Sequence, residues 1–170
     1  RIGQATPVTP TSIASIALLA SRGKARTVED LATHCSELQE FVAAREIPTT
    51  EALSLDDPDR LSLVLERLVE HGDVSTHDAL GRTVYWADDD QMIRISYYRN
   101  MIVHFFILRA IAEISLSRLV GDSRASVDVF HKQALELRDL LKFEFFFAEK
   151  EEFLRRMEAD LETDVPGWKN

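Results

Sequence analysis

The chain has 170 residues, 45% of them hydrophobic, and a formal net charge of −9 at pH 7. This length corresponds to about one domain, and the composition is sufficient for a buried core. The acidic balance argues against nucleic acid as a partner, because neutralising phosphates requires a basic face. The one cysteine, Cys35, excludes an internal disulfide and indicates a reducing compartment. It stands on an apolar helix face and is interpreted as a small buried hydrophobe.

Residues 1–10 are predicted to be extended, because Pro7 and Pro10 bias the residues before them towards β or polyproline II conformations. The chain starts at Arg1 without a methionine. We therefore expect this stretch to be a link from an earlier domain of a longer protein.

Residues 11–90 are predicted to form a subdomain of three helices and a hairpin. Each helix is recognised by a capping residue in front of a proline or of an acidic N3 residue. The predicted N-caps are Thr9 before Pro10, Thr27 with Asp30, and Asp57 before Pro58, and Gly23 and Gly72 end the first and third helices.

After the third helix, the hydrophobic period changes from 3.6 to 2, which predicts a small hairpin from residues 73–75 and 83–86. Three helices followed by a hairpin resemble a winged helix, a common scaffold for DNA binding. The third helix, however, offers only Arg60 and Arg67 among several acidic residues, and the hairpin only Arg82. A wing-like module used for protein packing is favoured over DNA reading.

The long stretch Ile93 to Val120 is predicted to be one helix, apolar on nearly every side and without Gly or Pro. Arg109 and Glu113 interrupt its apolar run, and the longest stretch without a charged residue, Asn100 to Leu108, is too short to span a bilayer. We therefore expect a core helix packed on at least two sides and no transmembrane span.

Two further helices are predicted after this one. The first is capped by Ser123 or Ser126 and runs to about Phe143, and the last, strongly charged helix runs from Lys150 to Glu162. The dense phenylalanines between them indicate either burial on several sides or a helix break near residue 147. The predicted fold class is mainly α, with a winged-helix-like first half and residues 91–170 forming a long-helix bundle that packs as one unit with residues 11–90.

The sequence contains no recognisable catalytic centre. A His-x4-Asp pair is absent, because the residues five after the histidines are Gln39, Thr76, Arg82, Arg109 and Glu136. A P-loop, a G-x-G-x-x-G motif and a nucleophile elbow are also absent. The five histidines lack the spacing of metal ligands, so we expect neither a metal nor a cofactor.

The polar residues of the long helix are the remaining candidates. Arg99, Asn100 and His104 have a structural interpretation, in which the arginine pairs with a carboxylate and the other two bind backbone groups. In the functional interpretation they support a neighbouring active site, or the arginine faces a phosphate.

Three segments resemble the region downstream of the acyltransferase domain in bacterial membrane-bound glycerol-3-phosphate 1-O-acyltransferases. They are TPVTPTSIASIALL at Thr6–Leu19, ISYYRNMIVHFF at Ile95–Phe106 and LLKFEFFFAEKEEF at Leu140–Phe153. Their order and spacing agree with that family over nearly the whole chain. The family's His-x4-Asp base and its basic, Gly-rich substrate motifs belong upstream and are absent here.

The resemblance implies a C-terminal helical part that supports an upstream acyltransferase domain of the same protein and helps it to dock on the membrane. That domain would move an acyl group from acyl-CoA or acyl-carrier protein to glycerol 3-phosphate in phospholipid synthesis, at the cytoplasmic face of the cell membrane. The segment alone would be inactive. Two alternatives remain open: a stand-alone helical interaction or regulatory module without catalysis, and a membrane-surface protein in its own right.

Overall fold

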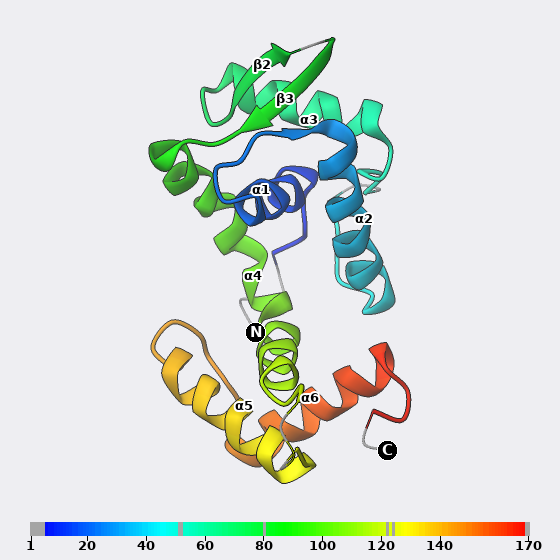
Figure 1. The fold of residues 1–170 in the computed structure, drawn as a ribbon, viewed down its shortest axis with the longest axis vertical. Helices are drawn as coiled ribbons and strands as arrows, with labels where there is room; N and C mark the ends of the chain where they lie inside the picture. The colour runs from blue at the N-terminus through cyan, green and yellow to red at the C-terminus, as the bar shows by residue number, and fades with distance from the viewer. Residues whose placement is uncertain (1–5, 51–52, 80, 122, 124, 169–170) are drawn as a thin grey trace. The chain divides into compact units, whose positions relative to one another are not determined.

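The computed structural model describes residues 6–50, 53–79, 81–121, 123 and 125–168. Contacts group the chain into two compact units, Arg1–Val103 and His104–Asn170. The helix α4, Asp89–Ser117, contributes residues to both (Figure 1). The predicted fold class, mainly α with a small hairpin after the third helix, is confirmed. The predicted division near residue 90 and the packing of the two halves as one unit stay predictions.

The first unit contains three helices and a small antiparallel sheet in the predicted order. Its elements before α4 are α1 Pro10–Ala20, β1 Arg26–Thr27, α2 Val28–Ala44, α3 Pro58–Glu70, β2 Ser75–Ala79 and β3 Arg82–Trp86. The sheet order is β1-β3-β2, with Thr27 opposite Val84 and Thr76 opposite Tyr85. The two-residue strand β1 was not predicted, because two residues are too few to show an alternating pattern.

The predicted helix caps are confirmed. The Thr9 hydroxyl oxygen accepts a hydrogen bond from the Ser12 N–H, and the Thr9 N–H donates to the Ser12 hydroxyl oxygen, which makes a capping box that was not predicted. Thr27 and Asp30 form the predicted box at the start of α2. Each box provides partners for N–H groups that the first helical turn leaves unpaired.

The part of α4 in the first unit is buried along one face and exposed along another. Ile95 and Ile102, two turns apart, are fully buried. Ile93, Tyr97 and Met101 are 73%, 69% and 38% exposed. Because these three follow one another at intervals of four residues, they form one apolar stripe along the helix, here called the α4 stripe.

The helix α4 begins at Asp89, four residues before the predicted start. Asp88 and Gln91 explain this difference, because each accepts a hydrogen bond from the backbone N–H of the other, at 2.8 and 3.0 Å. This reciprocal capping makes Asp89 and Asp90 part of the first turn of the helix.

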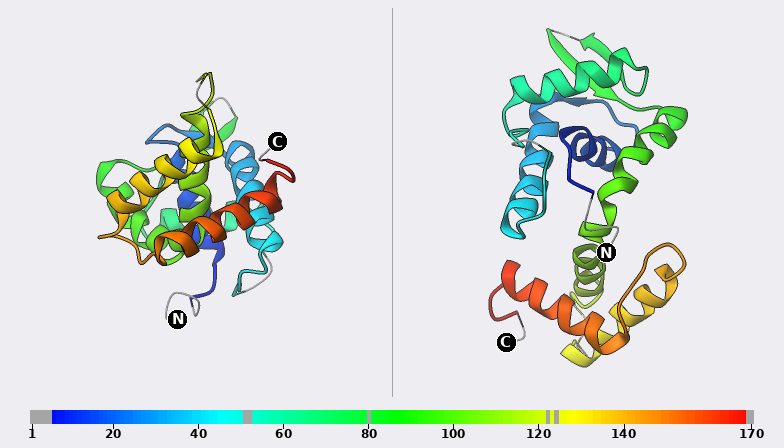
Figure 2. Two further views of the ribbon diagram at one scale, coloured as in Figure 1. Left: turned by 90° about the horizontal axis from the view of Figure 1, so that it is seen from below. Right: turned by 180° about the vertical axis from the view of Figure 1, so that it is seen from behind.

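The second unit packs the end of α4 with α5, Val127–Leu141, and α6, Lys150–Asp164 (Figure 2). Ser126 caps α5, as one of the two predicted candidates. Of the two interpretations of the phenylalanine-rich stretch, the structure shows the helix break, since residues 142–149 separate the two helices. The core of this unit consists of Ile111, Ala112, Phe130, Ala134, Leu137, Phe153, Met157 and Leu161.

Among the described residues, α4 is the one helix with the length and apolar character to cross a membrane, and 22% of its most apolar window is buried. One such helix is weak evidence for a span, because a core helix of a soluble protein has the same properties. The described residues thus cover less of α4 than expected for a core helix packed on several sides.

Candidate functional site

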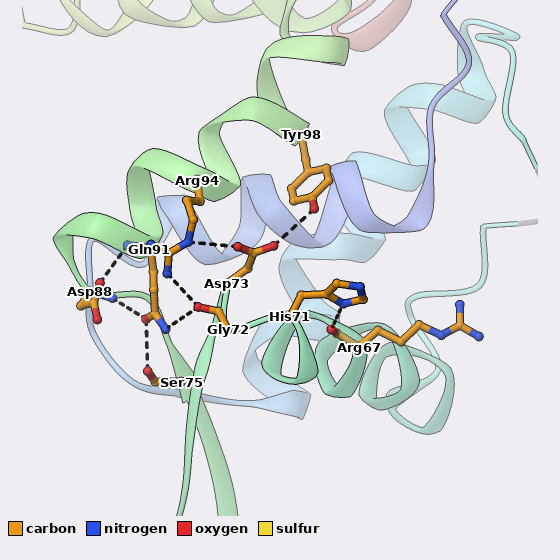
Figure 3. Close-up of polar contacts among 9 residues, drawn as sticks. All are labelled: Arg67, His71, Gly72, Asp73, Ser75, Asp88, Gln91, Arg94 and Tyr98. Carbon is orange, nitrogen blue, oxygen red and sulfur yellow. Dashed lines mark hydrogen bonds and ion pairs between the residues drawn. The ribbon is translucent and has the colours of Figure 1, made fainter.

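The polar side chains of the first unit converge where α3 ends and α4 begins (Figure 3). The helix α3 ends in a Schellman motif, in which the N–H groups of Gly72 and Asp73 donate to the carbonyls of Val69 and Leu68. Gly72 has a φ of +75°, a conformation that favours glycine. The motif leaves the carbonyl of Gly72 pointing towards α4.

Two side chains of α4 bind that carbonyl. Gln91 donates from Nε2 at 3.1 Å, and Arg94 donates from Nη2 at 2.8 Å. The amide oxygen of Gln91 also accepts a hydrogen bond from Ser75, the first residue of β2, at 3.1 Å. One glutamine therefore caps its own helix and joins it to the end of α3 and the start of the hairpin.

Asp73 is the charged centre of this junction, and the residue is only 8% exposed. Its two carboxylate oxygens accept from Nε of Arg94 at 3.1 Å and from the hydroxyl of Tyr98 at 3.3 Å. Burial, and then the charge of Asp73, raise the pKa of Tyr98 above its usual value. The phenol thus stays protonated and serves as a hydrogen-bond donor.

The predicted residues lie on the next turns of α4. The guanidinium of Arg99 donates to the amide oxygen of Asn100 from Nε at 3.1 Å and from Nη2 at 2.8 Å. The ring of His104 lies against that of Phe105, with centroids 4.0 Å apart. The structure thus brings Arg99 and Asn100 into contact, and the arginine binds an amide instead of the carboxylate expected in the structural interpretation.

Sequence reasoning missed an arginine of α4 that binds a carboxylate far away in the sequence. Arg94 and Asp73 are 21 residues apart, and no local pattern connects them. The spacing of Asp88 and Gln91 was a readable signal, because an acceptor followed three residues later by Gln is a capping pattern.

The described residues offer little catalytic chemistry. They contain no group of three or more His, Cys, Asp or Glu side chains able to hold a metal ion. A cavity of about 390 Å³ beside the end of α2 is lined by residues that include Val42, Ala43, Ile47 and Leu53, with Glu40 and Glu46 as its acidic members. Cys35 is buried, and burial raises the pKa of its thiol to about 12, so it does not act as a nucleophile.

Comparison with known proteins shows what kind of chain has this architecture. Residues 1–165 match the family model described as the glycerol-3-phosphate acyltransferase C-terminal region. The chain belongs to this family.

Similar proteins include the "Putative acyltransferase plsB1" of Mycobacterium tuberculosis and of Mycobacterium bovis, each 36% identical over 168 residues, which are 97% of this chain. The "Glycerol-3-phosphate acyltransferase" of Aeromonas hydrophila is 26% identical over 154 residues, 91% of this chain. The chain spans 26% of the length of the mycobacterial relatives and 18% of that of the Aeromonas relative.

This glycerol-3-phosphate acyltransferase C-terminal region therefore combines a fixed polar junction with uncovered apolar surfaces. The junction of Asp73, Gln91 and Arg94 holds the first turns of α4 in place. The same turns carry the exposed α4 stripe. An exposed apolar surface on a rigid element is typical of a binding surface.

Proposed function

We propose that this chain is the C-terminal helical part of a glycerol-3-phosphate 1-O-acyltransferase and supports an acyltransferase domain that precedes it in the same protein. The observation that carries the proposal is the family match over residues 1–165. In the proposed reaction, the upstream domain transfers an acyl group from acyl-CoA or acyl-carrier protein to glycerol 3-phosphate. The present segment performs no chemistry and is inactive alone.

The α4 stripe supports this proposal as the contact surface for the upstream domain. Ile93 and Tyr97 together expose more apolar area than an isolated surface residue. Burying each side chain in an interface contributes about 1.5–3 kcal/mol to the free energy of association. The polar junction holds the stripe in a single position before binding, which lowers the entropic cost of association.

Arg99, Asn100 and His104 are proposed to support the substrate site of that domain. The Asn100 amide oxygen binds two donors of the Arg99 guanidinium and so fixes the direction of its charge. A fixed guanidinium suits a phosphate oxygen pair better than a lysine would, because its donors form a planar fork.

The proposed location is the cytoplasmic face of the cell membrane, with peripheral attachment and no span contributed by this segment. The named activity of the Aeromonas relative supports a membrane-associated role, since glycerol 3-phosphate acylation makes a lipid from a soluble precursor.

The proposal is tested by measuring acyl transfer to glycerol 3-phosphate with three samples: this chain, the upstream domain, and the two joined. We expect activity only in the joined protein. An upstream domain that is stable and fully active without these residues would contradict the supporting role.

Two sets of variants in the joined protein locate the contacts. Ile93→Asp combined with Tyr97→Asp should reduce activity at least tenfold, whereas Leu63→Asp, on a leucine of α3 that is 59% exposed, should not. Arg99→Ala should raise KM for glycerol 3-phosphate more than it lowers kcat. An unchanged KM would assign Arg99 to a packing role.

A further inference from the structure

The connection between α5 and α6 carries the most exposed aromatic side chains of the second unit. It follows Leu141 and ends at Lys150, and it is drawn in orange beyond the end of α5 in Figure 1. Phe143 is 87% exposed, Phe146 is fully exposed, and Leu140 beside them is 72% exposed. These three side chains are called the apolar tip.

The base of the tip is firmly held. Phe147 packs edge-to-face on the buried Phe153, with ring centroids 5.4 Å apart. Arg138, on α5, donates two hydrogen bonds to the carbonyl of Ala148, at 3.2 and 2.7 Å. The N–H groups of Glu144 and Phe145 donate to the carbonyl of Leu141, both at 3.0 Å, which closes the turn. The exposure of the tip therefore follows from a fixed turn.

Neighbouring phenylalanines divide between the two sides of this turn. Phe145 and Phe147 are half-buried and lie near each other, with centroids 6.2 Å apart, whereas Phe143 and Phe146 face outwards. Two large rings in water cost free energy in proportion to their apolar area, and an apolar protrusion of this kind is typical of a surface with a partner.

The charges around the tip are balanced. Residues 138–150 contain three basic side chains and three acidic ones, so their net charge is zero. The basic members are Arg138, Lys142 and Lys150, and the acidic members are Asp139, Glu144 and Glu149. Asp139 forms ion pairs with both Arg138 and Lys150, at 2.8 and 3.1 Å, so these charges partly neutralise one another.

We propose that the apolar tip inserts into the interfacial layer of a lipid bilayer and that zwitterionic phospholipid is sufficient for its binding. Protruding rings need no preformed groove in a bilayer, whereas a protein partner would have to supply one. The charged residues around the tip include both signs, and so does the headgroup layer of a zwitterionic bilayer. Lys142, whose ammonium lies 5.3 Å from the centroid of Phe143, extends towards the headgroups while the ring enters the acyl region.

This inference rests on the proposed function in one respect: an enzyme that makes a lipid has a bilayer as its working surface. It deepens that function by naming the segment that touches lipid and the lipid class that suffices. It also makes a separate claim, that binding does not depend on salt or on anionic lipid. The reason is that the binding surface consists of apolar rings and the residues around them carry no net charge.

The experiment uses the 170-residue chain with an environment-sensitive nitrobenzoxadiazole label at Glu144→Cys, between the two exposed rings. The native Cys35 is buried and does not compete for the label. Phosphatidylcholine vesicles should produce a blue shift and a several-fold rise in emission. Replacing half of the lipid by phosphatidylglycerol, or raising the salt concentration, should not strengthen binding.

The matched control is the same label at Glu136→Cys, an exposed acidic residue of α5, which should show no change. Phe143→Ser combined with Phe146→Ser should lower vesicle partition at least tenfold, because each ring contributes about 1.5 kcal/mol, equivalent to roughly a tenfold change. Leu63→Ser should leave partition unchanged. The serine variant should keep its circular dichroism, since both rings are exposed.

The inference is overturned if the Glu144→Cys label does not respond to phosphatidylcholine, or if the serine variant binds vesicles as the parent does. It is also overturned if the label in the joined protein is already shielded without lipid, because a protein surface then covers the tip. Acyl transfer in detergent solution separates the two claims. If the joined protein is active in detergent but the Glu144→Cys label does not respond to vesicles, lipid binding by the apolar tip is rejected and the proposed function stands. If the label responds but the joined protein is inactive, the proposed function is rejected and lipid binding by the tip stands.

Discussion

The hydroxyl of Tyr98 donates a hydrogen bond to Oδ2 of Asp73 across 25 residues of sequence, at 3.3 Å. With the Arg94–Asp73 ion pair, this bond joins α4 to the end of α3. Arg94 and Tyr98 directly follow Ile93 and Tyr97, so the α4 stripe that we propose as a contact surface is held by groups on the same turns of the helix.

Removing this hydrogen bond should destabilise the chain. Tyr98→Phe should lower the free energy of unfolding by about 1 kcal/mol, and Asp73→Ala by about 1–3 kcal/mol, because the second change also leaves Arg94 without its carboxylate. Urea denaturation measures both. Tyr97→Phe is the matched control, since Tyr97 is 69% exposed, and it should have no effect. Equal effects at the two tyrosines would contradict the role of Asp73.

The junction should also weaken at high pH. Because the pKa of Tyr98 is raised in the folded chain, the folded state holds its proton more tightly than the unfolded state does. The contribution of the tyrosine is complete below its ordinary pKa of about 10 and falls as the pH rises above it. Urea titrations at pH 8 and pH 11 should show a smaller difference between parent and Tyr98→Phe at the higher pH.

The ion pairs at the base of the apolar tip should respond to acid. Hydrogen bonding to Lys150, and then the Lys150 charge and the Arg138 guanidinium, lower the pKa of Asp139. A lowered pKa gives stability that is present above the unfolded value of about 3.9 and is lost as the pH falls through the folded value. A double-mutant cycle of Asp139→Asn and Lys150→Met should show coupling at pH 7 that decreases as the pH falls below the unfolded value. Coupling that persists in acid would contradict the ionic origin.

Cys35 should be unreactive in the folded chain. Its thiol is fully buried with a pKa of about 12, so the thiolate is scarce and inaccessible. Ellman's reagent should react with it only after unfolding in urea, whereas Glu136→Cys should add a thiol that reacts at once. Rapid reaction of the parent chain would place Cys35 at the surface.

The core of the second unit should depend strongly on Phe153, which supports the tip through Phe147. Phe153→Ala should lower the free energy of unfolding by about 3–5 kcal/mol, because it leaves a cavity in a packed core. Phe146→Ala removes an equally large side chain that is fully exposed, and it should change stability by less than about 0.5 kcal/mol. Calorimetric unfolding of the two variants makes the comparison.

Local patterns in the sequence were sufficient to predict the helices, the hairpin and most of the caps. Capping groups act over three residues, and a helix face repeats every three or four, so Thr9, Thr27 and Asp57 are readable without a structure. The resemblance also pointed to the family that the match over residues 1–165 shows. Arg99 and Asn100 were recognised as polar residues on an apolar helix, and their mutual contact was within local reach.

Only the tertiary structure decided which of these groups meet. Arg94 and Tyr98 lie 21 and 25 residues from their partner Asp73, and composition cannot decide which of Arg94 and Arg99 binds a carboxylate. The same limit applies to the phenylalanines of residues 143–147, because four identical side chains divide into inward and outward pairs only when the turn is built. Local sequence sets backbone propensity, whereas burial and charge pairing depend on distances that only the folded chain defines.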